Sequence, residues 1–162
     1  MKLALLLVIM ILVSCCRNLS AAEIAVRLVD IGNGAGEKNC EVSLMGGSGD
    51  QAAQVKLKWL PGIHFQKTQA DGRVRFNLTG PLPTYISVIA GSHECFQCGQ
   101  LEMTTTEQLL RTGAASKMDG KNLKGELYCH PNLSKLKDIT PNPGEFLIFV
   151  RKVSFWDKLS LY

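Results

Sequence analysis

The sequence predicts a mainly β protein, an antiparallel β-sandwich of about seven or eight strands with one short helix. Three observations favour this class. Apolar and polar residues alternate with a period of two in several short segments. Glycine, proline and Asp-Gly turn signals separate these segments. A helical pattern is recognisable at residues 105–112.

The expected strands follow from this alternation. In "EIAVRLVD", Ile24, Val26 and Leu28 fall on one face, which is typical of a half-buried strand. The segment "TYISVIAG" is apolar on both faces and is therefore expected in the middle of a sheet. In "CEVSL", Cys40 shares the inward face with Val42. The expected strands are residues 23–30, 40–44, 54–60, 65–67, 73–78, 84–91 and 144–152, with a short apolar piece at 127–129.

Two local signals mark turns and the helix. Asp71-Gly72 stands between two alternating runs and predicts a β-hairpin, and Pro61-Gly62 predicts a turn. For the helix, Thr104 is expected as the N-cap and Glu107 as its capping-box partner. Leu109 and Leu110 are expected to face the core, with Gly113 as the helix stop.

The N-terminus has the pattern of an export signal. Lys2 precedes an apolar run from Leu3 to Val13, which has the length of a signal-peptide core and is too short for an ordinary membrane span. "SAA" before Glu23 predicts cleavage after residue 22. Alternatively, "LVSC" resembles a bacterial lipobox, which would make Cys15 a lipidated first residue. Residues 1–22 are therefore predicted to be a signal peptide, or a lipoprotein signal that ends before Cys15.

Composition indicates one ordinary domain. Eighteen basic and 14 acidic residues give a formal charge of +4, and loss of Lys2 and Arg17 with the signal leaves about +2. This charge is far from that of a typical nucleic-acid binder. Residues 23–162 suit a single domain. No G-x-S-x-G, phosphate-loop or dinucleotide pattern occurs, so no catalytic residue and no cofactor is assigned.

Cleavage leaves four cysteines: Cys40, Cys95, Cys98 and Cys129. In an oxidising compartment an even number predicts two disulfides, in any of three connectivities. Cys95 and Cys98 have C-x-x-C spacing, which leaves two alternatives. A thiol-redox site would need a helix start that this segment lacks. A metal site would combine Cys95, Cys98 and Cys129 with His130.

Aromatic residues offer a possible ligand surface. Trp156 and Phe155, near the C-terminus, are candidates for stacking against a sugar ring. Trp59 and Tyr85 could join this surface if exposed, but Trp59 alternates with lysines in a strand pattern and is expected in the core. His64 follows the Pro-Gly turn and is expected at the surface.

The segment "KTQADGRVRFNL" resembles the strand-turn-strand motif of bacterial carboxypeptidase regulatory-like domains, with Thr68, Asp71, Gly72, Val74 and Phe76 at its characteristic places. The resemblance covers most of residues 23–158 and implies a prealbumin-like or starch-binding-like sandwich. It also implies an accessory module without peptidase activity, because the H-x-x-E motif of the peptidase domain does not occur. Carbohydrate binding is common in related sandwiches.

The sequence therefore predicts an exported, non-enzymatic binding or interaction module. Its expected partner is a glycan or a cell-envelope protein, not a nucleic acid, and membrane contact is expected only through a lipid on Cys15. The alternative is a thiol-redox or metal-binding protein that uses Cys95, Cys98, Cys129 and His130.

Overall fold

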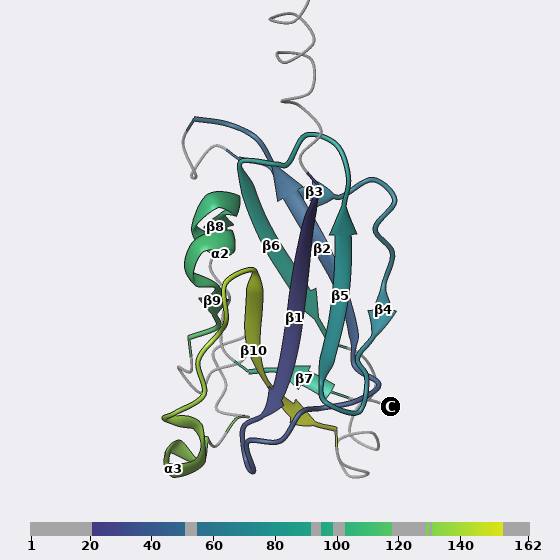
Figure 1. Ribbon diagram of the computed structural model, residues 1–162. Coiled ribbons are helices and arrows are strands. Elements are labelled where there is room, and N and C mark those ends of the chain that lie inside the picture. Colours follow the sequence, from purple (N-terminus) through teal and green to yellow (C-terminus); the bar gives the residue numbers. More distant parts are fainter. Residues whose placement is uncertain are drawn as a thin grey trace, which may run out of the picture.

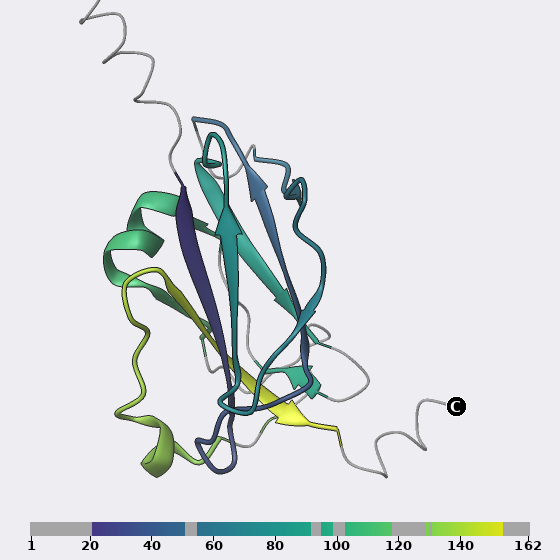
Figure 2. The same cartoon turned by 45° about the vertical axis from the view of Figure 1, so that its right-hand side comes forward.

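The computed structural model describes residues 21–50, 55–91, 95–98, 103–117, 129 and 131–153. Within them the chain forms two β-sheets that lie one behind the other, with two short helices beside them (Figures 1 and 2). The helices are α2 (Thr106–Thr112) and α3 (Leu133–Leu136). The strands are β1 (Ala22–Asp30), β2 (Glu41–Gly47), β3 (Lys58–Trp59), β4 (Gln66–Lys67), β5 (Arg73–Leu78), β6 (Tyr85–Ala90), β7 (Cys95–Gln97), β8 (Thr104–Thr105), β9 (Ala114–Ala115) and β10 (Glu145–Lys152).

The first sheet has the strand order β5-β1-β10-β7, and β9 also pairs with β10. β1 runs antiparallel to β5 but parallel to β10, with Ala25 opposite Glu145 and Asp30 opposite Val150. The sandwich class predicted from the sequence is confirmed, and this parallel central pair is an addition to the antiparallel arrangement that was expected. A parallel neighbour requires a long connection, and here nearly the whole chain separates the two strands.

The second sheet has the order β3-β2-β6-β8, with β4 also paired to β2, and all of its ladders are antiparallel. β6 lies between β2 and β8, so the central position predicted for residues 84–91 is confirmed. The predicted strand at 54–60 is reduced to the two residues of β3, and the one at 65–67 to the two residues of β4. Both occupy the edge beside β2.

Apolar side chains from both sheets fill the space between them and form the main core. Cys40, Phe76, Phe146 and Ile148 are almost completely buried there, so Cys40 points inward as predicted. A second cluster lies on the opposite side of β10 and contains Val29, Ile31, Leu136, Leu147 and Phe149, together with Cys98 and Cys129. β10 is thus buried on both faces, which explains why its sequence is a nearly continuous apolar run.

The Asp71-Gly72 turn is present, but it does not close a simple hairpin. Gly72 has a φ of +76°, and its N–H donates to the carbonyl of Gln69. The strands on either side belong to different sheets, because β4 pairs with β2 whereas β5 pairs with β1. The turn therefore carries the chain from one sheet to the other. A Cβ on Gly72 would lie 2.3 Å from the Leu28 carbonyl oxygen, so the position requires glycine.

Helix α2 confirms the predicted helix but not its cap. The N-cap is Thr105, whose hydroxyl accepts from the Gln108 N–H at 3.1 Å, and Gly113 ends the helix as expected. The prediction that Thr104 is the cap is wrong. Thr104 belongs to β8, where it lies opposite Ile86 of β6 and is buried in the sheet. Leu109 is buried, whereas Leu110 is 37% exposed and does not face the core.

The polar segment after α2 contains structure that the sequence did not predict. α3 packs Leu136 into the second cluster, and its N-cap position is Asn132. Of the apolar piece predicted at 127–129, residues 127 and 128 lie outside the described residues. In the described part of the chain, the helices are too short or too polar to cross a membrane.

Candidate functional site

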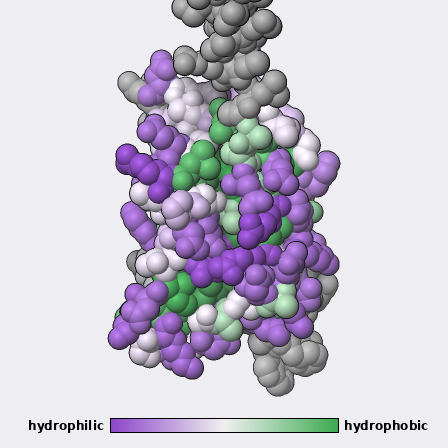
Figure 3. Space-filling model, viewed as in Figure 1, coloured by the Kyte–Doolittle hydropathy of each residue, from purple (hydrophilic) through white to green (hydrophobic). Residues whose placement is uncertain are grey.

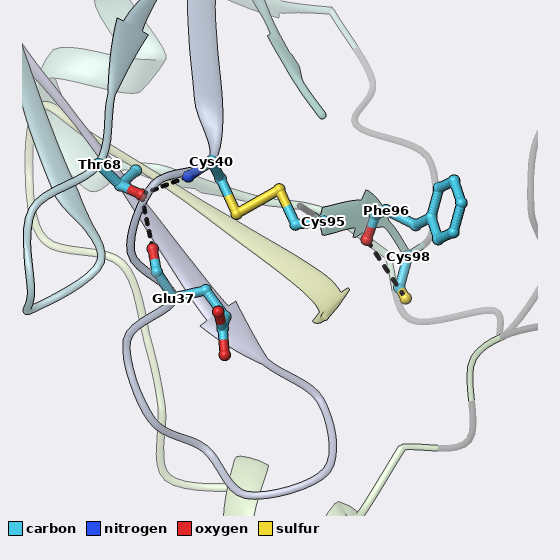
Figure 4. Close-up of a disulfide and its surroundings, with 6 residues drawn as sticks. All are labelled: Glu37, Cys40, Thr68, Cys95, Phe96 and Cys98. Carbon is cyan, nitrogen blue, oxygen red and sulfur yellow. Dashed lines mark hydrogen bonds between the residues drawn. A yellow bond between two sulfur atoms is a disulfide. The ribbon is translucent and has the colours of Figure 1, made fainter. Parts of the chain in front are cut away.

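Two disulfides account for the four cysteines, as the even number predicted. Cys40 bonds to Cys95, and Cys98 bonds to Cys129. Cys40 precedes β2 and Cys95 begins β7, so the first disulfide joins the two sheets across the main core (Figure 4). The second attaches the chain at residue 129 to the outer side of the first sheet, within the second cluster. The C-x-x-C motif thus supplies one sulfur to each of two different bridges.

Thr68 holds the chain in place beside the first disulfide (Figure 4). Its buried hydroxyl accepts from the Cys40 N–H at 3.1 Å and donates to the Glu37 carbonyl at 2.6 Å. Its backbone N–H donates to the Cys40 carbonyl, and its carbonyl accepts from the Asn39 N–H. Burial, reinforced by the nearby Asp30 carboxylate, raises the pKa of the Glu37 carboxyl. This Thr68 network has a structural role, since all of its contacts fix the backbone before β2.

The disulfides leave none of the four cysteines as a free thiolate, which a metal site would require. His130 lies outside the described residues, as do Cys15, Phe155 and Trp156. In the described part of the chain, no group of three or more His, Cys, Asp or Glu side chains is placed to hold a metal ion. The redox and metal alternatives therefore gain no support from the geometry.

An exposed aromatic pair lies at the edge of the second sheet. Trp59 and Phe65 are each 50% exposed, and their ring centroids are 5.3 Å apart with an interplanar angle of 59°. The expectation that Trp59 lies in the core is wrong. β3 is a two-residue edge strand, and Trp59 lies opposite Met45 on the side of β2 that faces away from the main core.

The chain between the two rings explains their position. Leu60 and Ile63 pack against the main core, and the Ile63 N–H donates to the Leu60 carbonyl at 3.1 Å. Gly62 has a φ of +74° after Pro61, which is the pattern of a type II turn and confirms the turn predicted there. Two anchored side chains and one tight turn therefore hold Trp59 and Phe65 together at the surface.

Next to the aromatic pair, most of the outward-pointing residues of β2 and β6 are uncharged. Val42 and Leu44 of β2 point into the main core, so Ser43 and Met45 between them point outward. Ser43 lies opposite Ile89, which is 39% exposed. We define the aromatic face by these outward residues of the second sheet: Trp59, Phe65, Met45, Ser43 and Ile89.

Ser43 is unusual within the aromatic face. It is only 1% exposed, and its hydroxyl has no hydrogen-bond partner among the described residues. A buried hydroxyl without a partner costs about 1–3 kcal/mol. Tyr85, the other aromatic candidate, lies half-buried on the same side of the sheet, opposite Gly47. His64 is exposed beside Phe65, as expected.

A polar pocket of about 380 Å³ lies on the opposite side of the molecule, against the first sheet. Two of its lining residues, Arg27 and Arg73, bond to the buried carboxylate of Glu145, at 3.1 Å and 3.2 Å, and the Glu145 side chain is only 3% exposed. The backbone N–H and side-chain amide of Asn142 also donate to Glu145, at 3.0 Å each. Arg27 further donates to the Thr140 carbonyl at 2.6 Å. These contacts attach residues 140–145 to β1 and β5.

The rim of the polar pocket is acidic. Asp71 and Asp138 contribute carboxylates to it. The backbone N–H of Arg73 donates to Asp71 at 3.0 Å and holds the pKa of that carboxyl below its usual value. Because the two arginines already share Glu145, the pocket carries no excess of positive charge. We therefore regard the polar pocket as structural and the aromatic face as the candidate binding site.

Sequence reasoning identified Trp59 as an aromatic candidate, but missed Phe65 and the partnership of the two rings. The available signal was the Pro61-Gly62 turn, which brings the residues on either side of it close together. No family model, curated protein or solved structure matches the chain. The resemblance to carboxypeptidase regulatory-like domains accordingly stays a prediction.

Proposed function

We propose that the protein is an exported binding module that recognises glycans by stacking a sugar ring on Trp59 and Phe65. The observation that carries the proposal is that each of these two rings is 50% exposed, whereas other large apolar side chains of the same sheet are buried in the main core. Exposed aromatic surface that the fold keeps out of its core is typical of a binding site. Aromatic rings also supply a flat apolar surface at low cost in conformational entropy.

Export is supported by two independent features. Two disulfides suit an oxidising compartment, where such bonds persist. The apolar run from Leu3 to Val13 has the length of a signal-peptide core. Polysaccharides of the envelope or the surroundings would be available to a protein in that location.

The geometry of the pair fits one sugar ring better than a long flat chain. Rings tilted by 59° do not form a continuous plane, so one aromatic face can stack on a sugar while the other borders its edge. The exposed His64 side chain, next to Phe65, offers a polar group to the hydroxyls of such a ligand. Polar and stacking contacts together are what a sugar, with hydroxyl edges and an apolar face, requires.

The test is a glycan screen on the protein purified after export, followed by titration of its tryptophan fluorescence. Trp59→Ala and Phe65→Ala should each weaken binding of a glycan found in the screen about tenfold or more, since a central aromatic contributes about 1–3 kcal/mol. Leu133→Ala is the matched control, because Leu133 is 64% exposed on α3. Equal loss in all three variants, or no loss in the first two, would contradict the proposal.

An envelope protein is a second candidate partner, supported by the continuation of the apolar surface to Met45 and Ile89. A protein interface of ordinary size would cover more than the two rings. Ile89→Ser should then weaken the interaction as strongly as Trp59→Ala. If a sugar stacks on the rings alone, Ile89→Ser should leave its affinity unchanged.

A further inference from the structure

β5 is the longest edge strand of the described chain. It lies at one side of the first sheet and pairs with β1, and no described strand pairs with its other side (Figure 1). The strands at the remaining sheet edges, β3, β4, β7, β8 and β9, have only two or three residues each. Short edge strands offer little for another chain to pair with, whereas a regular strand of six residues is a template for strand addition.

The free side of β5 is identified by the direction of its main-chain groups. In an antiparallel ladder, successive residues turn their N–H and C=O groups alternately toward one neighbour and toward the other. The Gly72 carbonyl accepts from an N–H of β1 at 2.8 Å, whereas the Arg73 carbonyl accepts from the Gln69 N–H at 2.9 Å, on the other side. Arg75 and Asn77 follow Arg73 at intervals of two, and they therefore also turn their main-chain groups away from β1.

These outward groups have no partners in the described part of the chain. Among the described residues, no hydrogen bond reaches the main-chain N–H or C=O of Arg75 or Asn77 on this side. At Arg73 the corresponding groups are bonded locally, since its N–H donates to Asp71 at 3.0 Å. The side chains of Arg75 and Asn77 are exposed. Two donors and two acceptors therefore face outward within three residues of β5.

This edge is complementary to a second copy of itself. When two β5 strands run antiparallel with their Phe76 residues opposite each other, Arg75 of each copy lies opposite Asn77 of the other. Every outward donor then meets an outward acceptor. The buried residues Val74, Phe76 and Leu78 stay on the core side in both copies. The contact is isologous, because each copy contributes the same surface.

Charge also favours this register. Arg75 lies opposite an uncharged asparagine, and its guanidinium is already paired with Glu23 of its own copy. The joined outer faces place two arginines and two glutamates around the twofold axis, without a net charge. The register with Arg75 opposite Arg75 would instead set like charges directly across the ladder, which is destabilising.

We infer that the protein forms a reversible dimer in which two β5 strands pair antiparallel, so that the first sheets of two copies join into one continuous sheet. The inference goes beyond the proposed function and does not depend on it, because the aromatic face belongs to the second sheet. The contact contains four main-chain hydrogen bonds, two donated by each strand. An interface of this size is weak, so we expect a Kd between about 1 µM and 1 mM.

Hydrogen exchange of the exported protein, resolved by residue, tests the contact directly. Between about 1 µM and 1 mM protein, exchange at the Arg75 and Asn77 amides should slow at least about twofold, in proportion to the monomer that is lost. The Val74 and Phe76 amides are an internal control. They bond to β1 and should stay equally protected at all concentrations. Sedimentation velocity should show the rise from monomer to dimer over the same range.

A proline at the free edge tests the main-chain pairing. Asn77→Pro removes an N–H that does not bond to β1, and edge positions of this kind tolerate proline. Because the contact is symmetric, two hydrogen bonds are lost, and Kd should rise about tenfold or more. Asn77→Ala is the matched control, since it keeps every main-chain group and should dimerise like the unsubstituted protein. Thermal unfolding checks that both variants are folded.

Several outcomes would overturn the inference. A protein that stays monomeric at about 1 mM has no such contact. A dimer that leaves exchange at Arg75 and Asn77 unchanged, or that persists in a folded Asn77→Pro variant, uses another surface. If Asn77→Pro does not fold, hydrogen exchange of the unsubstituted protein decides alone. A dimer with slowed exchange at both residues, together with a negative glycan screen, would keep this inference and remove the proposed function.

Discussion

The outer faces of the two sheets differ in how far their apolar side chains are buried and their charges are paired. On the first sheet the chain returns through α3, buries Leu147 and Phe149 in the second cluster, and pairs Arg27 and Arg73 with Glu145. On the face drawn in Figure 3, which has β1, β5 and β10 in front, hydrophilic residues form a band across the middle. The aromatic face of the second sheet instead leaves Trp59 and Phe65 each 50% exposed.

This difference separates stability from recognition. On the covered face, charges are paired and apolar side chains are buried, so a substitution there should mainly reduce the free energy of unfolding. On the aromatic face, the rings of Trp59 and Phe65 are half exposed, so a substitution there should mainly reduce binding. The following experiments test whether the two faces are separable in this way.

The disulfides should produce the largest effects on stability. Cys40→Ala with Cys95→Ala opens a loop with a sequence separation of 55 residues, and Cys98→Ala with Cys129→Ala opens one of 31. Loop-closure entropy predicts losses of about 4 and about 3.5 kcal/mol. Urea unfolding measures both, and hydrogen exchange should show that the second loss is concentrated at residues 131–140. If hydrogen exchange in the second variant became as fast in β2 and β6 as at residues 131–140, the segment 131–140 would not be stabilised separately from the second sheet.

Glu145→Ala should cost about 3 kcal/mol, because it leaves the largely buried Arg27 without its carboxylate partner. Trp59→Ala should cost about 1 kcal/mol, since half of that side chain is exposed. Urea midpoints would compare the two variants, with Glu145→Gln as a control that retains shape but loses charge. A larger loss in Trp59→Ala would show that the aromatic face is part of the stabilising core.

Two turn glycines provide a matched comparison. Gly72 and Gly62 have nearly equal φ values, +76° and +74°. A Cβ would meet the Leu28 carbonyl oxygen at 2.3 Å in the first case and nothing within 4 Å in the second. Gly62→Ala should therefore cost about 1 kcal/mol for backbone strain alone, and Gly72→Ala about 2–3 kcal/mol. Equal shifts in melting temperature would mean that the chain near Gly72 can relax.

The smallest effect is expected at the helix cap. Thr105→Ala should cost about 1 kcal/mol, because the Gln108 N–H loses its acceptor. Thr104→Val should leave stability unchanged or increased, because the buried Thr104 hydroxyl has no partner among the described residues. Thermal unfolding of both variants checks the assignment. A greater loss in Thr104→Val would restore Thr104 as the residue that holds the helix start.

Local patterns were sufficient for several parts of the fold. Alternation located β1, β5 and β10, since each presents a continuous apolar stripe to the core, and Asp71-Gly72 located a turn that requires positive φ. The even number of cysteines predicted two disulfides. Connectivity was not predictable, because it depends on which distant segments meet. The parallel pairing of β1 with β10 and the pairing of β4 with β2 were not predictable for the same reason.

The candidate site was less accessible to sequence reasoning. Trp59 alternates with lysines, and in a central strand this pattern would have buried the ring. In the structure β3 is a two-residue edge strand, and the direction of a side chain there has little effect on its burial. Exposure of Trp59 and Phe65 is thus set by the length and position of the strand, which local composition does not encode.

The pairing of β1 with β10 has a consequence for the order of events during biosynthesis. These are the first and last strands of the described chain, and they are neighbours in the first sheet. Closing such a long loop is entropically costly and is associated with slow folding. A nascent chain holds β1 without this neighbour until its final segment has been made. The first sheet therefore cannot be completed, and β1 cannot gain its parallel partner, before β10 has been synthesised.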